Sequence, residues 1–192
     1  KNSPGKTPEH RIKTIESAGR LKIPFTTGIL IGIGETKEDR IRSLKIIRDL
    51  HTRYDHIQEV IIQNFLPKKG TFMESCKPSS LCEIKETVKL ARGILPDDIA
   101  IQIPPNLIPL DLLPELVRCG VDDLGGISTV TLDYINPESC WPTGKELRYI
   151  LKDFILKERL PIYPRFVKDG WYSKKVGRVI EFYADEDGFK KE

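Results

Sequence analysis

The chain has few of the residues that most directly indicate metal or disulfide chemistry. Its 192 residues include four cysteines, three histidines and one methionine. The cysteines, Cys76, Cys82, Cys119 and Cys140, match no zinc or iron–sulfur spacing, and they are too few for a disulfide framework in a chain of this length. We therefore expect free thiols, as in a reducing cytoplasm.

Groups for acid–base or nucleophilic catalysis are also scarce. His10, His51 and His56 fall on predicted helices or just before a strand, where a structural role is expected. No Ser-His-Asp or Cys-His arrangement is visible, and no pair of acids has an interpretable spacing. A chain with so few proton-transfer groups is typical of chemistry that a cofactor performs.

Long apolar runs and an excess of one charge are absent as well. The longest apolar stretch, residues 29–33, is broken by glycine and is far shorter than the roughly 20 residues that cross a bilayer. Lys and Arg number 31 against 28 Asp and Glu, a net charge of +3, with no basic stripe. We expect neither a membrane nor a nucleic-acid partner, and we expect a cytoplasmic location because no signal peptide is visible.

An initiating methionine is missing: the chain begins with Lys1, and its sole methionine is Met73. We expect either that the start was processed off or that this is the C-terminal part of a longer polypeptide. The length suffices for one domain with a sizeable core. A content of 39% hydrophobic and 31% charged residues is ordinary for a globular protein.

Strand and helix patterns alternate along the chain. Thr7 with Pro8, Thr36 with Asp39, and Ser79 or Ser80 are helix-start signals. Strand 25–31 is apolar throughout, as expected where both faces are covered. The expected strands are 25–31, 59–65, 99–103 and 121–126. The expected helices are 8–20, one beginning near residue 37, 80–93, 110–118 and 144–158.

This alternation predicts an α/β fold with parallel strands and right-handed crossovers. About four units are present, whereas a closed (β/α) barrel of the TIM type takes about 250 residues. The pattern therefore fits the second half of such a barrel or a small open sheet. We assign residues 1–160 to this barrel portion and residues 161–192 to an aromatic and charged C-terminal extension.

Polar or backbone-shaping residues lie at the end of every predicted strand, and in a barrel parallel strands direct such ends to one mouth. Side-chain amides at a mouth can read the edge of a polar heterocycle, because each supplies donors and an acceptor. The residues are Gly32, Gly34 and Glu35 at the end of the first strand, Gln63 and Asn64 at the end of the second, Gln102 and Asn106 at the end of the third, and Asp123, Gly125, Gly126 and Ser128 at the end of the fourth.

Simpler interpretations exist for several of these residues. Glu35 can complement a helix dipole. Gln63 and Asn64 can bond loop backbone, as buried amides often do, and Asp123 can cap a turn. The glycines of the first loop lack the third glycine of a dinucleotide fingerprint.

Residues 28–36, Gly-Ile-Leu-Ile-Gly-Ile-Gly-Glu-Thr, resemble the glycine-rich strand of radical S-adenosylmethionine (SAM) enzymes of the biotin-synthase-like branch. Other segments resemble the first subunit of the deazaflavin-forming synthases of coenzyme F420 biosynthesis. The resemblance covers about residues 3–166. The matching segments are 3–6, 18–28, 56–65, 101–107, 123–128 and 135–138.

This resemblance implies a partial (β/α) TIM-type barrel of the radical SAM type. It implies a [4Fe–4S] cluster that cleaves SAM to methionine and a 5′-deoxyadenosyl radical. The radical would abstract hydrogen from an adduct of a tyrosine-derived hydroxybenzyl group and 5-amino-6-ribitylaminouracil. Oxidation, ring closure and loss of ammonia would then give the deazaflavin. The implied partner is the second subunit or a fused counterpart.

The resemblance also implies site residues. Those expected to border SAM are Gly28, Ile29, Gly32, Gly34 and Glu35. Those expected to border the substrate are Gln63, Asn64, Gln102, Asn106, Asp123, Gly125, Gly126 and Ser128.

One departure from the family is large. The family's C-x3-C-x2-C cluster motif has no match in this chain, so we expect the cluster ligands in a missing N-terminal part and no activity from the chain alone. A related radical SAM enzyme, such as a futalosine-pathway cyclase or the second subunit, is an alternative. A non-catalytic half-barrel that binds a partner is another.

Overall fold

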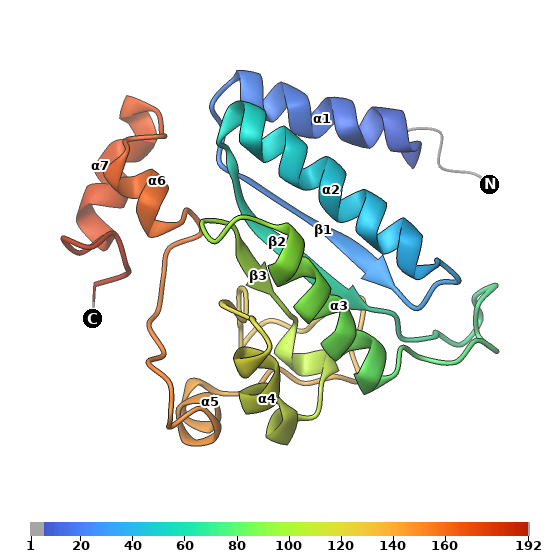
Figure 1. The fold of residues 1–192 in the computed structure, drawn as a ribbon. Coiled ribbons are helices and arrows are strands. Elements are labelled where there is room, and N and C mark those ends of the chain that lie inside the picture. Colours follow the sequence, from blue (N-terminus) through green and yellow to red (C-terminus); the bar gives the residue numbers. More distant parts are fainter. Residues whose placement is uncertain (1–5, 192) are drawn as a thin grey trace. The chain divides into compact units, whose positions relative to one another are not determined.

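The computed structural model describes residues 6–191, so most of the matching segment 3–6 lies outside the described residues. The fold is α/β, as predicted, with a three-stranded sheet in the order β1-β2-β3 (Figure 1). Strand β2 pairs in parallel with β3, and Ile61 lies opposite Gln102. The strands are β1 (Phe25–Ile31), β2 (Ile57–Asn64) and β3 (Ala100–Gln102).

The predicted fourth strand is wrong, because only one bridge forms there, between Gln102 and Asp123. The backbone amides of Asp122 and Asp123 both donate to the carbonyl of Ile101, at 2.9 and 3.2 Å. A parallel ladder has evenly spaced bonds, so two successive amides on one carbonyl interrupt it. The chain then turns away at Gly125, whose φ is +73°.

The helix-start signals are confirmed. Thr7 caps α1, and Ser80 forms a capping box with Glu83 at the start of α3. Thr36 and Asp39 exchange the same two bonds before α2. The helices are α1 (Pro8–Arg20), α2 (Lys37–Tyr54), α3 (Leu81–Ile94), α4 (Leu113–Arg118), α5 (Gly144–Ile150), α6 (Pro164–Lys168) and α7 (Lys174–Tyr183), with 3-10 turns η2 (Pro105–Leu107) and η3 (Leu110–Leu112).

Helix α5 ends at Ile150, so the predicted helix 144–158 is too long. Beyond it, Ile155 is 91% exposed, so a longer helix would have buried little apolar surface there. Helical propensity alone rarely sustains a helix without such burial. None of the helices in residues 6–191 combines the length and apolarity that a membrane crossing needs.

The chain forms two compact units. The first comprises residues 1–27, 47–58 and 157–192, and so includes the C-terminal extension. In this unit His56 is fully buried and its Nε2 lies 2.9 Å from the carbonyl oxygen of Ile15. Phe166 is also buried and packs edge-on against Trp171. These contacts give the histidine and the aromatic tail structural roles.

The second unit comprises residues 28–46 and 59–156 and holds every predicted site residue. Its buried apolar side chains come mainly from the strands and from α2, α3 and α4. They include Ile31, Leu44, Val60, Ile62, Ile84, Val88, Ala91, Ile101, Ile103, Leu113 and Leu116.

The two faces of this sheet differ, and the expectation that both faces of β1 are covered is wrong. Ile31 is fully buried, whereas Gly28 is exposed and Leu30 is 43% exposed. Strand β2 alternates in the same way near its end, with Ile62 buried and Ile61 partly exposed. We call the side with Gly28, Leu30, Ile61 and Gln102 the open face of the sheet.

The contact between β1 and β2 yields a stability prediction. An ideal Cβ at Gly28 would lie 2.4 Å from the carbonyl oxygen of Ile61, so Gly28→Ala must shift the strands apart. We expect a loss of about 1–3 kcal/mol in the free energy of unfolding, measured by urea titration.

Gly93→Ala is the matched control. Gly93 lies in α3 with no atom within 4 Å of its ideal Cβ, so alanine should stabilise the protein by up to about 1 kcal/mol. Equal effects of the two substitutions would contradict the predicted clash.

Candidate functional site

The loop after β1 turns through two glycines with left-handed backbones, Gly32 at φ +88° and Gly34 at φ +98°. An ideal Cβ at Gly32 would lie 2.1 Å from Oγ of Ser79. That hydroxyl donates to the carbonyl of Ile31 at 2.7 Å and accepts from the amide of Phe65 at 3.2 Å. It thus ties the ends of β1 and β2 together.

The three glycines Gly28, Gly32 and Gly34 therefore differ in what occupies the space beside their backbones. At Gly28 and Gly32 the protein itself occupies the space, through Ile61 and Ser79. Only Gly34 has no atom within 4 Å of an ideal Cβ, so it alone of the three leaves open space beside the backbone. A contact of these residues and of Ile29 with SAM stays a prediction.

Glu35 organises the same loop. Its carboxylate accepts from the amides of Gly32 and Ile33, each at 2.8 Å. It also forms an ion pair with Arg40, whose guanidinium lies 2.6 Å away, and both side chains are nearly buried, at 13% and 11% exposure. Arg40 continues to Thr87 of α3, where it donates to the hydroxyl at 3.0 Å.

The pKa of Glu35 follows from these contacts. Burial by itself would raise the pKa of this carboxyl. The amides of Gly32 and Ile33 and the Arg40 guanidinium outweigh that effect and hold the pKa below its ordinary value. The carboxylate thus stays ionised at neutral pH and works as an anchor for the loop.

The amides at the ends of β2 bond the backbone. Asn64 is only 4% exposed, and its Nδ2 donates to the carbonyl of Leu107, after β3, at 3.1 Å. Gln63 donates to the neighbouring carbonyl of Asn64 at 3.4 Å. In this structure both side chains make the loop contacts that the simpler interpretation proposed.

Asn106 joins a hydrogen-bond cluster that the sequence interpretation missed. Asp133 accepts from the amide groups of Asn106 and Asn136, both at 2.9 Å, and from the backbone amides of Ile135 and Asn136. Burial raises the pKa of Asp133, but these donors outweigh it and hold the pKa below the usual value. The Asp-x-x-Asn spacing, typical of a turn closed by a side chain, was the available signal.

A second link joins the long loops. Lys68, after β2, forms an ion pair with Glu138, which lies in the loop that Asp133 organises. The loops after β2, β3 and the Gln102–Asp123 bridge are thus connected within one unit. Three of the predicted strand ends are therefore neighbours, as a shared mouth would require.

The last group surrounds Gln102. Asp123 accepts from the amide of Gly125 at 2.5 Å, which closes a turn. An ideal Cβ at Gly125 would lie 2.3 Å from Nε2 of Gln102, so the two residues are in direct contact. Gly126 has open space at its Cβ position. Ser128 accepts from the amide of Thr131 at 3.0 Å and so bonds its own loop.

The cysteines do not form a metal site in the part of the chain that the structure describes. Cys76, Cys82 and Cys140 are exposed and Cys119 is partly buried. No three of them bring their sulfurs close enough to share an ion among residues 6–191. These residues do not fit an iron–sulfur cluster.

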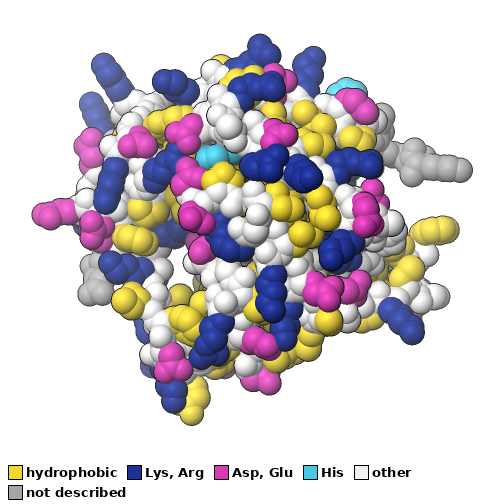
Figure 2. Space-filling model, viewed as in Figure 1, with side chains coloured by type: hydrophobic (Ala, Val, Ile, Leu, Met, Phe, Trp, Pro, Cys, Tyr) yellow, Lys and Arg dark blue, Asp and Glu magenta, His cyan; other side chains and the backbone are white. Residues whose placement is uncertain are grey.

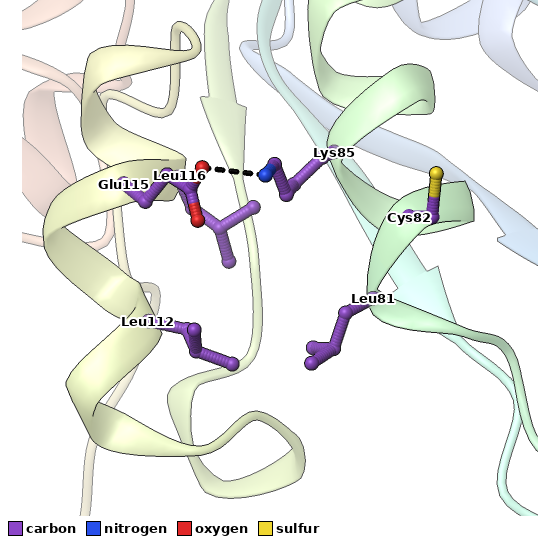
Figure 3. Close-up of a pocket in the computed structure, with 6 residues that line it drawn as sticks. All are labelled: Leu81, Cys82, Lys85, Leu112, Glu115 and Leu116. Carbon is purple, nitrogen blue, oxygen red and sulfur yellow. Dashed lines mark hydrogen bonds and ion pairs between the residues drawn. The ribbon is translucent and has the colours of Figure 1, made fainter.

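The surface offers no other strong signal. On the side shown in Figure 2, basic and acidic side chains are interspersed. A cavity of about 290 Å³ lies between the start of α3 and the η3–α4 segment (Figure 3). Lys85 and Glu115 form an ion pair there. Its lining residues are Leu81, Cys82, Lys85, Leu112, Glu115 and Leu116, none of them a predicted site residue.

Comparison with known proteins gives one consistent result, although no family model matches the chain. Proteins named 7,8-didemethyl-8-hydroxy-5-deazariboflavin synthase align with its whole length. The one from Archaeoglobus fulgidus is 60% identical over 191 residues, 99% of this chain and 58% of the relative. That from Methanosarcina barkeri is 57% identical and that from Methanopyrus kandleri 48%. The chain spans little more than half the length of these relatives.

The Glu35 anchor predicts a pH-dependent stability. Because its folded pKa is lowered, its contribution is complete above the ordinary value of 4.5 and is lost as pH falls through the folded pKa. We expect Glu35→Gln to lose about 2 kcal/mol at pH 7. The difference from wild type should shrink below about pH 4.5, measured by urea titration at several pH values.

Glu38→Gln is the control for this prediction. Glu38 is exposed in the first turn of α2, so its replacement should cost under about 1 kcal/mol. A Glu35→Gln deficit that stays constant down to pH 3 would show that the ionised carboxylate is not the stabilising form.

Proposed function

The chain is homologous along its whole length to the 7,8-didemethyl-8-hydroxy-5-deazariboflavin synthases, and on that premise we propose that it takes part in forming the deazaflavin chromophore of coenzyme F420. The observation that carries this proposal is 60% identity over 99% of the chain. Identity at this level across both units makes a different reaction on the same scaffold a poor alternative.

We assign the reaction to the radical SAM class, as a carbon–nitrogen lyase. The substrate is the adduct of a hydroxybenzyl group and 5-amino-6-ribitylaminouracil, and the product is the deazaflavin, with ammonia released. SAM together with a [4Fe–4S] cluster supplies, when bound, the 5′-deoxyadenosyl radical that such chemistry needs. Since the described cysteines do not fit a cluster, its ligands belong to a part of the protein other than residues 6–191.

Residues of this chain fit the adenosine end of SAM. Leu30 and Ile33 are each 43% exposed and flank the loop in which Gly34 leaves open space. Apolar side chains beside bare backbone suit a flat aromatic base, which gains from both close approach and burial. Glu35 and Arg40 act indirectly, because they stabilise the conformation of this loop.

The open face of the sheet supports the finer fold assignment, a partial barrel completed by further chain. Strand β1 lies at one end of the strand order, and its open face carries exposed Leu30. An uncovered edge strand with apolar side chains is an aggregation hazard that proteins normally cover or pair. We propose that a strand of the complete protein pairs with β1, and that the second synthase subunit or a fused counterpart supplies the adduct.

The polar strand ends then serve the substrate. A ribityl chain and a uracil ring present hydroxyls, carbonyls and N–H groups, which amides and carboxylates can bond. The linked loops after β2 and β3 would also exclude water from the reacting centre, which protects a carbon radical from stray hydrogen donors. The link from Lys68 to Glu138 closes the loops on that side.

The test uses the protein made from its whole coding sequence. The protein is reconstituted anaerobically with iron and sulfide, then given a reductant, SAM and the adduct. We expect 5′-deoxyadenosine by chromatography and deazaflavin by its fluorescence, both dependent on SAM. Residues 1–192 alone should yield neither product. A cluster-loaded preparation that forms 5′-deoxyadenosine but no deazaflavin would reject the substrate assignment, and one that forms neither would reject the reaction class.

A further inference from the structure

Gln102 stands apart from the other predicted amides. The residue is only 7% exposed, and its side-chain amide has no hydrogen-bond partner among residues 6–191. By contrast, Gln63, Asn64 and Asn106 each donate to a protein oxygen. The Gln102 amide is not among the fully enclosed polar groups that lack a partner, so its nitrogen and oxygen are in contact with solvent. Its donors and acceptor therefore remain available for a ligand.

The position of Gln102 places it at the predicted mouth. It is the last residue of β3 and lies opposite Ile61, so both side chains stand on the open face of the sheet. Ile61 in turn contacts Gly28 of β1. The row from Gly28 through Ile61 to Gln102 forms an apolar floor with one amide at its end.

A cradle holds the Gln102 side chain. Gly125, at φ +73°, would place a Cβ only 2.3 Å from Nε2 and 2.9 Å from Cδ of Gln102. Asp123 fixes the turn at that glycine by accepting its amide at 2.5 Å. Any side chain at Gly125 would displace the Gln102 amide, so this glycine keeps the amide in place.

We propose that the Gln102 amide reads the N–H and C=O edge of the pyrimidine ring of the substrate. Oε1 would accept from the ring N–H and Nε2 would donate to the adjacent carbonyl, a two-bond match that an amide makes with an imide edge. Ile61 lies under the ring, and Gly125 acts as a positioning residue. This inference rests on the proposed function, which supplies the class of substrate.

Direct binding tests the proposal without requiring turnover. The probe is 5-amino-6-ribitylaminouracil, and equilibrium dialysis gives its dissociation constant with the protein made from its whole coding sequence. We expect Gln102→Met, which is similar in size but has no amide, to weaken binding about tenfold to a hundredfold. The thermal midpoint should change little, because the native amide has no protein partner to lose.

Two glycine variants separate positioning from folding. Gly125→Ala should weaken binding by a factor similar to that of Gln102→Met, because it displaces the amide. Gly93→Ala, in α3, where no atom lies within 4 Å of an ideal Cβ and φ is not left-handed, should leave binding unchanged. In the double variant Gln102→Met with Gly125→Ala the two losses should not multiply. If Gly125→Ala does not fold, the dissociation constant of Gln102→Met alone tests the proposal.

The outcomes are distinct from those that test the reaction. Unchanged affinity in folded Gln102→Met overturns the inference, as does a wild-type protein that does not bind the probe. If the variant weakens binding as expected but the wild-type protein forms no deazaflavin, the result supports this inference and rejects the proposed reaction. Multiplicative losses in the double variant would reject the positioning role of Gly125.

Discussion

The second unit, which holds the predicted site residues, depends on the close approach of the chain to itself at three glycines. Gly28 admits the Ile61 carbonyl, Gly32 admits the Ser79 hydroxyl, and Gly125 admits the Gln102 amide. Each contact brings the carboxyl end of one strand against the next segment, so the polar ends become neighbours. A methyl group at any of these positions would force atoms within 2.5 Å of one another, which packed interiors do not tolerate.

Carboxylates stabilise the loops and turns that these close contacts allow. Glu35 holds the loop after β1, Asp123 holds the turn at Gly125, and Asp133 holds the long loop beyond it. Each accepts from backbone amides of its own loop, which otherwise would need water or a ligand as partner. All three carboxylates are thus engaged as acceptors within the loops that they stabilise.

The share of the relatives' length that the chain covers helps to explain these local features. The chain aligns with little more than half of proteins named for deazaflavin synthesis, and its own cysteines are scattered. An open sheet face and an edge strand with an exposed apolar side chain are costly in isolation. Under the proposed function, further chain and bound ligands would cover these features.

Much of this architecture could be predicted from sequence, because the signals are local. The caps Thr7, Thr36 and Ser80 bond within three residues, and β1 and α1 begin and end where predicted. The α/β class and the kinship to the synthases were likewise readable from order and motif.

Tertiary structure alone decided the rest. It reduced the fourth strand to one bridge, ended α5 at Ile150 and assigned Gly32 to Ser79, 47 positions further along the chain. It also left the Gln102 side-chain amide without a partner among residues 6–191, while it gave Asn64 a partner 43 positions away. A polar group's partner depends on which distant segments fold beside it, and no spacing within one segment carries that information.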